Sequence, residues 1–416
     1  MQFYRGYRMK AVTYKQDAKD KFYDVIILGA GPASLSVAIQ LMNSPEVKSI
    51  IILERMQKDF VLPPLKQNES SERIYADPAL FTQVINDISK SYLKQLGVLK
   101  PIEDLGVVSV QNQSFISPKK IEFTIQKDVL MTTRQRILLG LYSQIANSKK
   151  VRIFWKALFQ SLKFIPEEGI WTVSYTDING SEMNRRARLV VVADGAHCDA
   201  CSQLSLITSY FKPPNGFLLS SKLITEKYFP KQSSTNFNQI QTLTTSFSDG
   251  IVPGFSQYIT NTQNEAKTND LCISFTNTTA GGQPVSQLID QIFPHSPEEK
   301  MNAKCEIRMV RMTGHIFQPY LNHLIVVGGS AALCGPEGEE MEYALQSAEI
   351  AAGAIQEAFH RKNWGMFVLS RLYGNKIQKE IKNKMKSFVM EKCHSNRYII
   401  LQTSFLIEAH TNGQEI

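Results

Sequence analysis

The stretch that decides the fold is residues 24–41, DVIILGAGPASLSVAIQL. Residues 25–28 form a short apolar run, which is typical of a strand buried on both faces of a parallel sheet. A glycine-rich turn follows at residues 29–34 and leads into a helix, whose unpaired N–H groups and positive dipole end would face a bound anion. The stretch therefore predicts a strand–turn–helix unit of the kind that binds the phosphates of a dinucleotide.

The turn has the spacing G-x-G-x-x-S, which matches the dinucleotide fingerprint except at its last position. Gly29 permits a tight turn, and Gly31 lets a pyrophosphate approach the backbone. Ser34 replaces the third glycine and is small enough for the helix to pack closely on the strand. The predicted nucleotide contacts in this turn are Gly29, Gly31, Pro32, Ala33 and Ser34.

A second apolar run, at residues 50–53, ends in the acid Glu54. At this distance from the glycines a carboxylate would accept hydrogen bonds from an adenosine ribose. Glu54 and its neighbour Arg55 are therefore further candidates for the nucleotide site. A glycine-rich turn without a nucleotide is the alternative, but the order of strand, turn, helix, second strand and acid favours a nucleotide site.

The composition is that of a globular protein with a sizeable core. The chain has 416 residues, of which 43% are hydrophobic and 20% charged, and its net charge is +8. This length predicts two closely joined domains, or one large core with an appended domain. The positive charge is spread along the chain, so we expect no nucleic-acid partner. The sequence also contains no apolar stretch long enough to span a bilayer.

The six cysteines are too few for a disulfide scaffold in a chain of this length, and no signal-peptide pattern precedes the first strand. We therefore expect an intracellular, cytoplasmic protein. Cys198 and Cys201 form a C-x-x-C pair, but a zinc site needs a second ligand pair, which Cys393 and His394 do not supply convincingly. No metal site is predicted. The pair is interpreted as structural thiols, with a redox role as the alternative.

Both ends of the chain are basic. Residues 1–20 are predicted to form a flexible basic tail. The C-terminal segment, residues 363–416, is predicted to be helical, with lysines beside apolar residues in an amphipathic pattern. Peripheral contact with a membrane surface is one interpretation of this helix. A helix that packs on the core with a solvated lysine face is the preferred one; its pattern includes Lys376, Ile377, Lys379, Ile381 and Lys382.

Two helices are predicted between the second strand and the middle of the chain. Asp77 and Pro78 would begin the first, and Gly97 would end it. The second begins at Arg134, where a cation is poorly placed for the helix dipole unless an anion or a carbonyl group lies nearby. Arg134 is therefore a candidate anion contact, and a solvated arginine is the alternative.

Residues 188–197, RLVVVADGAH, form a hydrophobic strand that runs into Asp194 and Gly195. This places a carboxylate at the carboxyl end of the sheet, where open α/β sheets bind ligands. By itself, Asp-Gly after a strand is a common turn. Its interpretation therefore depends on the motifs found elsewhere in the chain.

A third motif lies in residues 324–355, LIVVGGSAALCGPEGEEMEYALQSAEIAAGAI. An apolar run stops at Gly328, Gly329 and Ser330, and a turn with Pro336 and Gly338 follows. The alanine-rich helix after this turn can approach a sheet closely, with its N-terminus directed at a ligand.

The joint order of these motifs resembles the FAD-dependent group A monooxygenases and the related geranylgeranyl reductases. The resemblance implies an α/β fold: a Rossmann-like FAD-binding domain, an inserted and mostly antiparallel β domain, and C-terminal helices. The predicted FAD-binding domain is discontinuous, comprising residues 21–205 and 321–362. Residues 206–320 would form the substrate-binding domain.

The resemblance also assigns roles to single residues. The glycine turn would bind the ADP part of FAD with Glu54 on its ribose, Arg134 would lie near the flavin's linking chain, and Asp194 with Gly195 would contact FAD and the nicotinamide cofactor. The late motif normally reads G-D-A, with its Asp on the ribityl hydroxyls, whereas this chain has Gly329 at that position. Loss of the carboxylate should weaken flavin binding or leave Ser330 and backbone groups to compensate.

The resemblance implies an NAD(P)H-dependent monooxygenase that hydroxylates or epoxidises an apolar small molecule through a flavin hydroperoxide. No second glycine fingerprint is present, so NAD(P)H would bind only transiently. Phe255 and Tyr258, in or next to the turn-rich loop 249–255, are candidate substrate contacts or ordinary core aromatics. Two alternatives remain: a flavin-dependent reductase of isoprenoid C=C bonds, and a degenerate flavoprotein that binds a ligand or partner without turnover.

Overall fold

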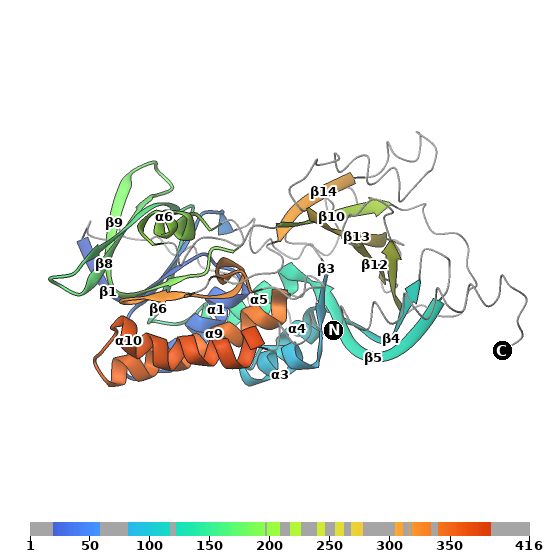
Figure 1. Cartoon of the computed structure of the whole chain (residues 1–416), viewed down its shortest axis with the longest axis horizontal. Helices are drawn as coiled ribbons and strands as arrows, with labels where there is room; N and C mark the ends of the chain where they lie inside the picture. Colours follow the sequence, from blue (N-terminus) through green and yellow to red (C-terminus); the bar gives the residue numbers. More distant parts are fainter. Residues whose placement is uncertain are drawn as a thin grey trace, which may run out of the picture.

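The computed structural model describes residues 20–58, 82–116, 122–195, 198–208, 217–225, 239–245, 254–261, 268–277, 304–310, 316, 318–333 and 340–383. Figure 1 shows two sheets at opposite ends of the molecule. Several predicted features lie outside the described residues: most of the basic tail, Asp77 and Pro78, the turn with Pro336 and Gly338, and the chain after residue 383.

The first sheet is built around five parallel strands in the order β16-β9-β1-β2-β6. A short strand, β15, pairs antiparallel with β16, and an antiparallel pair, β7 and β8, extends from the first half of β9. The bounds are β1 Asp20–Leu28, β2 Ile50–Glu54, β6 Val151–Trp155, β7 Leu158–Ile165, β8 Ile170–Thr176, β9 Glu182–Val192, β15 Tyr320–Leu321 and β16 Leu324–Val326.

The apolar runs recognised in the sequence form the centre of this sheet. Every residue of β2 is buried, and residues 25–28 of β1 are at most 2% exposed. Residues 189–192 of β9 are fully buried as well. Burial on both faces explains why these strands read as continuous apolar runs rather than as alternating ones.

Three helices pack together against this sheet: α1 Pro32–Met42, α5 Arg134–Ile145 and α9 Glu340–His360. α1 contacts both α5 and α9, while α6, Asp199–Ile207, lies beside β7 (Figure 1). Ser34 is fully buried in α1, and its hydroxyl donates to the carbonyl oxygen of Ala193 at 3.2 Å. A serine therefore serves in place of the third glycine of the fingerprint.

The second sheet has the order β14-β10-β13-β12-β11-β4-β5-β3 and is antiparallel except for the pair β11 and β4. Its mostly antiparallel character confirms the predicted fold class. Three of its strands come from residues 82–133, however, which the prediction placed with the FAD-binding part. The bounds are β3 Thr82–Ile85, β4 Val108–Ile116, β5 Glu122–Thr133, β10 Phe217–Thr225, β11 Gln239–Thr245, β12 Gly254–Asn261, β13 Thr268–Asn277 and β14 Lys304–Val310.

The predicted helix ending at Gly97 is wrong in its first part. The chain forms β3 up to Ile85, and helix α3, Asp87–Gln95, begins only afterwards. Asn86 caps α3, because its side chain accepts the backbone N–H of Ser89 at 2.9 Å. The apolar pair before Asn86 is paired with β5, so cross-strand pairing outweighs the helical spacing there. A short helix, α4 Leu99–Leu105, follows.

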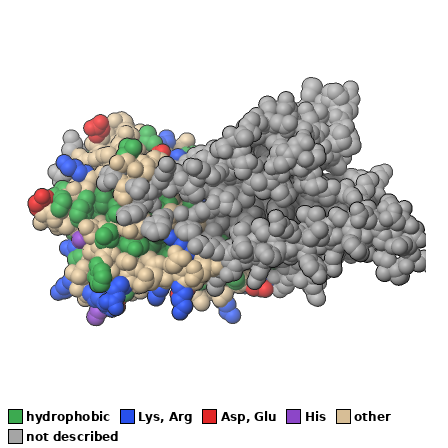
Figure 2. Space-filling model, viewed as in Figure 1, with side chains coloured by type: hydrophobic (Ala, Val, Ile, Leu, Met, Phe, Trp, Pro, Cys, Tyr) green, Lys and Arg blue, Asp and Glu red, His purple; other side chains and the backbone are tan. Residues whose placement is uncertain are grey.

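The C-terminal part of the described chain begins with α10, Met366–Leu369, and continues as π-helical turns over Ser370–Gly374 and Ile377–Lys382. Ile377 and Ile381 are fully buried, and Lys376 and Lys379 are exposed. Lys and Arg side chains accordingly lie along the lower edge of the molecule in Figure 2, near α9 and α10. This arrangement is that of a helix packed on the core with a solvated lysine face, the preferred interpretation.

Lys382 departs from the solvated pattern, because it is 3% exposed and its ammonium group donates to the carbonyl oxygen of Ile316 at 3.0 Å. Peripheral membrane contact through this helix gains no support, since its apolar side chains at positions 377 and 381 are buried. Among the described helices, none combines the length and the apolarity needed to cross a membrane.

Candidate functional site

The register of the first sheet brings the three motifs to one edge. Leu28 is paired with Leu53 and with Val192, and Val192 is paired with Val326. These four residues are the last or next-to-last of their strands, so the segments that follow them leave the sheet side by side. The glycine turn, Glu54, the Asp194–Gly195 turn and the late glycines therefore share the carboxyl edge, where α/β sheets bind ligands.

Gly29 is required by the close approach of the neighbouring strand. Its φ is +90°, and a Cβ atom added there would lie 2.6 Å from the carbonyl oxygen of Ala193 and 2.8 Å from the Cα of Asp194. Its N–H donates to the carbonyl oxygen of Leu53 at 2.8 Å. A side chain at this position would push the first and second motifs apart, in addition to straining the turn.

Gly31 has a different environment. It is the N-cap of α1 with φ −79°, and among the described residues a Cβ atom added there would meet one atom within 4 Å, Nη2 of Arg134 at 3.6 Å. The space over the N-terminus of α1 is thus bordered by a guanidinium group. Pro32, the first residue of α1, has no N–H and leaves the later N–H groups of the first turn to face this space.

Arg134 reaches this place as the first residue of α5, directly after β5. It is partly buried, so a freely solvated arginine is not what the structure contains. A cation beside a helix N-terminus is poorly placed for the dipole unless an anion or a carbonyl group lies nearby. Gly31 and Arg134 are about a hundred residues apart in the sequence, and the fold places the guanidinium group beside the N-terminus of α1, a combination that suits an anion.

Glu54 joins the second strand to the glycine turn. It is 8% exposed; Oε2 accepts the N–H of Ala30 at 2.6 Å and Oε1 accepts the N–H of Met56 at 2.9 Å. Each carboxylate oxygen keeps a second lone pair, so a sugar hydroxyl can still donate to it. Arg55, the next residue, is exposed. The anchoring role of Glu54 toward Ala30 was not predicted, because it depends on where β2 ends relative to the turn.

Ser330 connects the second and third motifs. It is fully buried; its hydroxyl accepts the N–H of Gly195 at 2.9 Å and donates to Oδ1 of Asp194 at 2.9 Å. Gly329, at the position of the family's Asp, contributes no carboxylate. The hydroxyl that was expected to compensate for that loss is thus engaged with Asp194.

Residues of α1 and α9 also contact the late motif and fix its position. Gly328 has φ +58°, and its N–H donates to the hydroxyl of Ser347 at 3.0 Å. A Cβ added to Gly328 would lie 3.1 Å from the Cβ of Ala33 and 3.6 Å from that of Ala344. Small residues here let α1 and α9 come close together behind the site, as the alanine-rich sequence suggested.

Asp194 lies in a cluster of polar side chains at the carboxyl edge of the first sheet. Burial raises the pKa of its carboxyl group, and hydrogen bonds from Cys198 and Ser330 partly oppose that shift. Burial also raises the pKa of the Cys198 thiol well above its ordinary value. The connection of the C-x-x-C pair with Asp194 was missed from the sequence, although the pair lies only a few residues further along the chain.

Both predicted substrate contacts lie on β12, so Phe255 belongs to the strand rather than to the preceding loop, since β12 begins at Gly254. Phe255 is paired with Thr244 and Tyr258 with Gln241 in the β11–β12 ladder. Positions three apart in a strand belong to opposite faces of the sheet. The contacts of these two side chains lie outside the described part of the structure.

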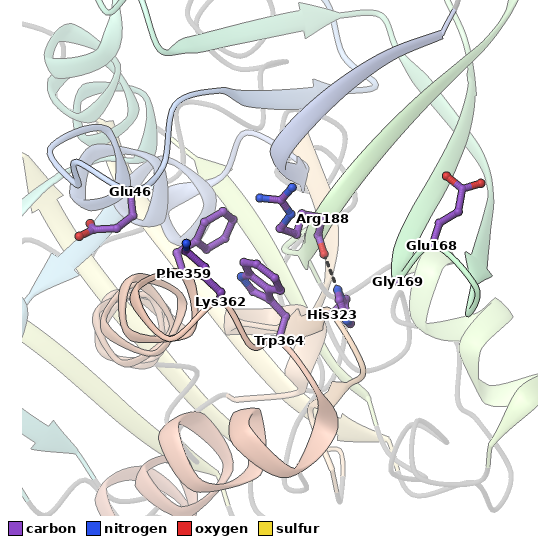
Figure 3. Close-up of a pocket in the computed structure, with 8 residues that line it drawn as sticks. All are labelled: Glu46, Glu168, Gly169, Arg188, His323, Phe359, Lys362 and Trp364. Carbon is purple, nitrogen blue, oxygen red and sulfur yellow. Dashed lines mark hydrogen bonds between the residues drawn. The ribbon is translucent and has the colours of Figure 1, made fainter.

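A cavity of about 560 Å³ lies at the other end of the parallel sheet (Figure 3). Arg188 and His323, at the amino ends of the buried parts of β9 and β16, line it together with Trp364. The guanidinium of Arg188 lies 4.9 Å from the ring centroid of Trp364, and Nδ1 of His323 is 2.9 Å from the carbonyl oxygen of Arg188. Of the predicted site residues whose side chains the structure describes, none borders this cavity. Within the described part of the chain, no group of three or more His, Cys, Asp or Glu side chains is placed to hold a metal ion.

Comparison with known proteins gives matches in structure alone. No protein-family model matches the chain, and no curated protein matches it in sequence. A geranylgeranyl bacteriochlorophyll reductase-like protein from Thermoplasma acidophilum is 14% identical with a TM-score of 0.65, over 88% of this chain and 85% of that one. The p-nitrophenol 4-monooxygenase of Pseudomonas putida is 11% identical with a TM-score of 0.56, over 85% and 84%. A myxobacterial chondrochloren halogenase, a variant of the FAD-dependent halogenases, is 15% identical with a TM-score of 0.56, over 85% and 78%.

The chain has the fold of these proteins, of which the halogenase is described as FAD-dependent. The matches extend over most of the chain, so both sheets and not the dinucleotide motif alone belong to the flavoprotein fold. This confirms the resemblance inferred from the order of the three motifs.

The edge fits the diphosphate-bearing half of FAD. The open position over Gly31, the N-terminus of α1 and the guanidinium of Arg134 form a cradle that an anion would fill. At the late motif the fit rests on backbone groups, because Gly329 has no side chain and Ser330 is engaged with Asp194.

Proposed function

We propose that this protein is an FAD-dependent oxidoreductase. The observation that carries the proposal is the cradle at the carboxyl edge, where the open Gly31 position faces the guanidinium of Arg134 at 3.6 Å. The flavoprotein fold of the whole chain supports the same cofactor. In this proposal Gly31 and the first turn of α1 bind the diphosphate, Arg134 neutralises it, and Glu54 receives the ribose hydroxyls.

FAD, when bound, would supply the hydride and electron transfer that side chains cannot perform. The chain's own part is to position the cofactor and to keep its surroundings dry. Ser330 and Asp194 hold the turn after β9 against the late motif, so that backbone groups of both motifs stay in place around the cofactor. Ser34 and Gly29 hold α1 against the same strand end.

The first experiment is a visible absorbance spectrum of the freshly purified protein, before and after addition of FAD. We expect the flavin bands to stay with the protein through gel filtration. Protein that remains colourless after incubation with FAD would contradict the proposal. It would favour a degenerate flavoprotein that binds a ligand or partner without turnover, for which the missing carboxylate at Gly329 is the motivating observation.

For the reaction, we propose an NAD(P)H-dependent monooxygenase of an apolar small molecule. The monooxygenase among the structural neighbours supports this choice. The second candidate is reduction of isoprenoid C=C bonds, which the reductase-like neighbour favours. Oxygen uptake separates the two. We expect NAD(P)H oxidation with candidate aromatic substrates to consume oxygen in proportion to product, whereas a C=C reductase would convert an isoprenoid substrate under anaerobic conditions with a chemical reductant.

A further inference from the structure

The two cysteines of the C-x-x-C pair after the Asp194–Gly195 turn are connected by a hydrogen bond. Cys198 is the N-cap of α6, and its Sγ accepts the N–H of Cys201 at 3.0 Å. The Sγ of Cys201 lies 3.5 Å from the carbonyl oxygen of Ser330. Both thiols are reduced in the structure, and Cys198 is 1% exposed and Cys201 0%. The Cys198 sulfur therefore lies against the backbone of Cys201, in the first turn of the helix that carries both residues.

A carboxylate completes this unit. The side chain of Asp194 is hydrogen-bonded to the Cys198 thiol and to the hydroxyl of Ser330. A thiol reacts as its thiolate, and burial raises the pKa of the Cys198 thiol well above its ordinary value, so the reaction depends on a group that takes its proton. Asp194 is in contact with the thiol, and burial, by raising the pKa of the carboxyl group, makes the carboxylate a stronger base than an exposed one.

We propose that Cys198 and Cys201 are a modification site at which hydrogen peroxide forms an intramolecular disulfide, with Asp194 as the base for Cys198. The spacing permits the bond, because residues three apart in the first turn of a helix have Cα atoms about 5 to 6 Å apart, within the range that disulfides span. The enclosure of both thiols selects the oxidant, since peroxide is hardly larger than water and larger disulfides cannot enter. The proposal does not depend on a bound flavin.

The chemistry has two steps. The Cys198 thiol gives its proton to Asp194 and its sulfur attacks one peroxide oxygen, so that an S–O bond forms, the O–O bond breaks and the leaving hydroxide takes up the proton as water. The Cys201 sulfur then attacks Cys198, forming the S–S bond and releasing the second oxygen as water. Two thiols lose two electrons in total, and one peroxide is reduced to two waters.

The test uses the full-length protein, reduced and then freed of reductant. It is exposed while folded to hydrogen peroxide, or in parallel to oxidised glutathione, and is then unfolded, alkylated, digested and analysed by mass spectrometry. We expect the peptide with both cysteines to lose two hydrogens and become resistant to alkylation, and dithiothreitol to reverse this. Oxidised glutathione should act at least about tenfold more slowly. The proposal is overturned if both thiols still take up the alkylating reagent, or if the peptide gains oxygen without forming a disulfide.

Asp194→Asn tests the base, and Asp199→Asn is its matched control, since Asp199 lies in the first turn of the same helix but is exposed. We expect Asp194→Asn to slow disulfide formation at least about tenfold and Asp199→Asn to leave the rate unchanged. Equal rates in the two variants would remove Asp194 from the mechanism.

A second pair of variants applies even if Asp194→Asn does not fold. Cys201→Ser should accumulate sulfenic acid on Cys198, which a dimedone label detects, whereas Cys198→Ser should show no label on Cys201. Labelling of Cys201 instead would overturn the assigned order of attack.

Discussion

At Gly29 an added methyl group would lie 2.6 Å from a backbone oxygen, whereas at Gly31 it would meet only the tip of Arg134, at 3.6 Å. The sequence motif gives these two glycines different roles, and their surroundings in the structure differ accordingly. Gly31→Val should fold normally, because φ of −79° suits any residue. We expect its affinity for FAD to fall at least about a hundredfold, because the side chain occupies the cradle; fluorescence titration of FAD measures this.

Gly353→Val is the control for this substitution, since Gly353 lies in α9 with nothing within 4 Å of an added Cβ. It should bind FAD like the unchanged protein. Gly29→Val should instead lose the cooperative unfolding transition, because the clash there is with backbone. Full retention of FAD by Gly31→Val would move the diphosphate away from the cradle.

Helix α3 shows, at the level of an element, how a cap fixes the residue at which a helix begins. Asn86 accepts the N–H of Ser89 at 2.9 Å, and its Nδ2 also donates to Oε2 of Glu342 in α9 at 2.7 Å. We expect Asn86→Ala to lower the free energy of unfolding by about 1 to 2 kcal/mol, because the first turn of α3 loses its cap and the link to α9 is broken. Urea unfolding followed by circular dichroism measures the change.

Asn179→Ala serves as the control, since Asn179 is exposed and uses its backbone N–H, not its side chain, to bond Asp177. Its effect should stay within about 0.5 kcal/mol. If both variants unfold at the same urea concentration, Asn86 is not the residue that begins α3.

The stability of the whole molecule should depend on pH through His323, whose pKa is lowered by burial. Its Nδ1 faces the carbonyl oxygen of Arg188 at 2.9 Å and donates to it in the neutral ring. Below a pH of about 6.5 the unfolded chain takes up a proton on this residue that the native chain does not. The free energy of unfolding should therefore fall as the pH is lowered from 7 to 5.

His323→Asn should remove part of this pH dependence, since Asn tolerates the φ of +59° at this position and its amide can still donate a hydrogen bond. Asn179→Ala, at an exposed position and without loss of a titratable group, is the control and should keep the pH dependence of the unchanged protein. Urea midpoints at pH 7 and pH 5.5 test both. A pH dependence that is identical in all three proteins would show that other groups cause it.

Much of the site follows from local sequence. The apolar runs that became β1, β2 and β9 and the turns after them were predicted correctly, because burial on both faces leaves a continuous apolar run in the sequence. The position of the ligand site at the carboxyl edge of the sheet could be predicted too, since parallel strands end on the same side. The partnership of Ser330 with Asp194 could not, because these residues are 136 positions apart and a hydroxyl at the end of a strand has no preferred partner of its own.

By itself, the sequence determined the buried strands at the centre of the first sheet, the order of the motifs and the glycine turn that opens α1. The tertiary structure alone decided which distant segments meet: Arg134 beside Gly31, Cys201 beside Ser330, and the strands of residues 82–133 with those of residues 217–310. The physical reason is that propensity and periodicity act over a few neighbouring residues. Strand pairing and close backbone approach depend on the path of the whole chain, which no local pattern records.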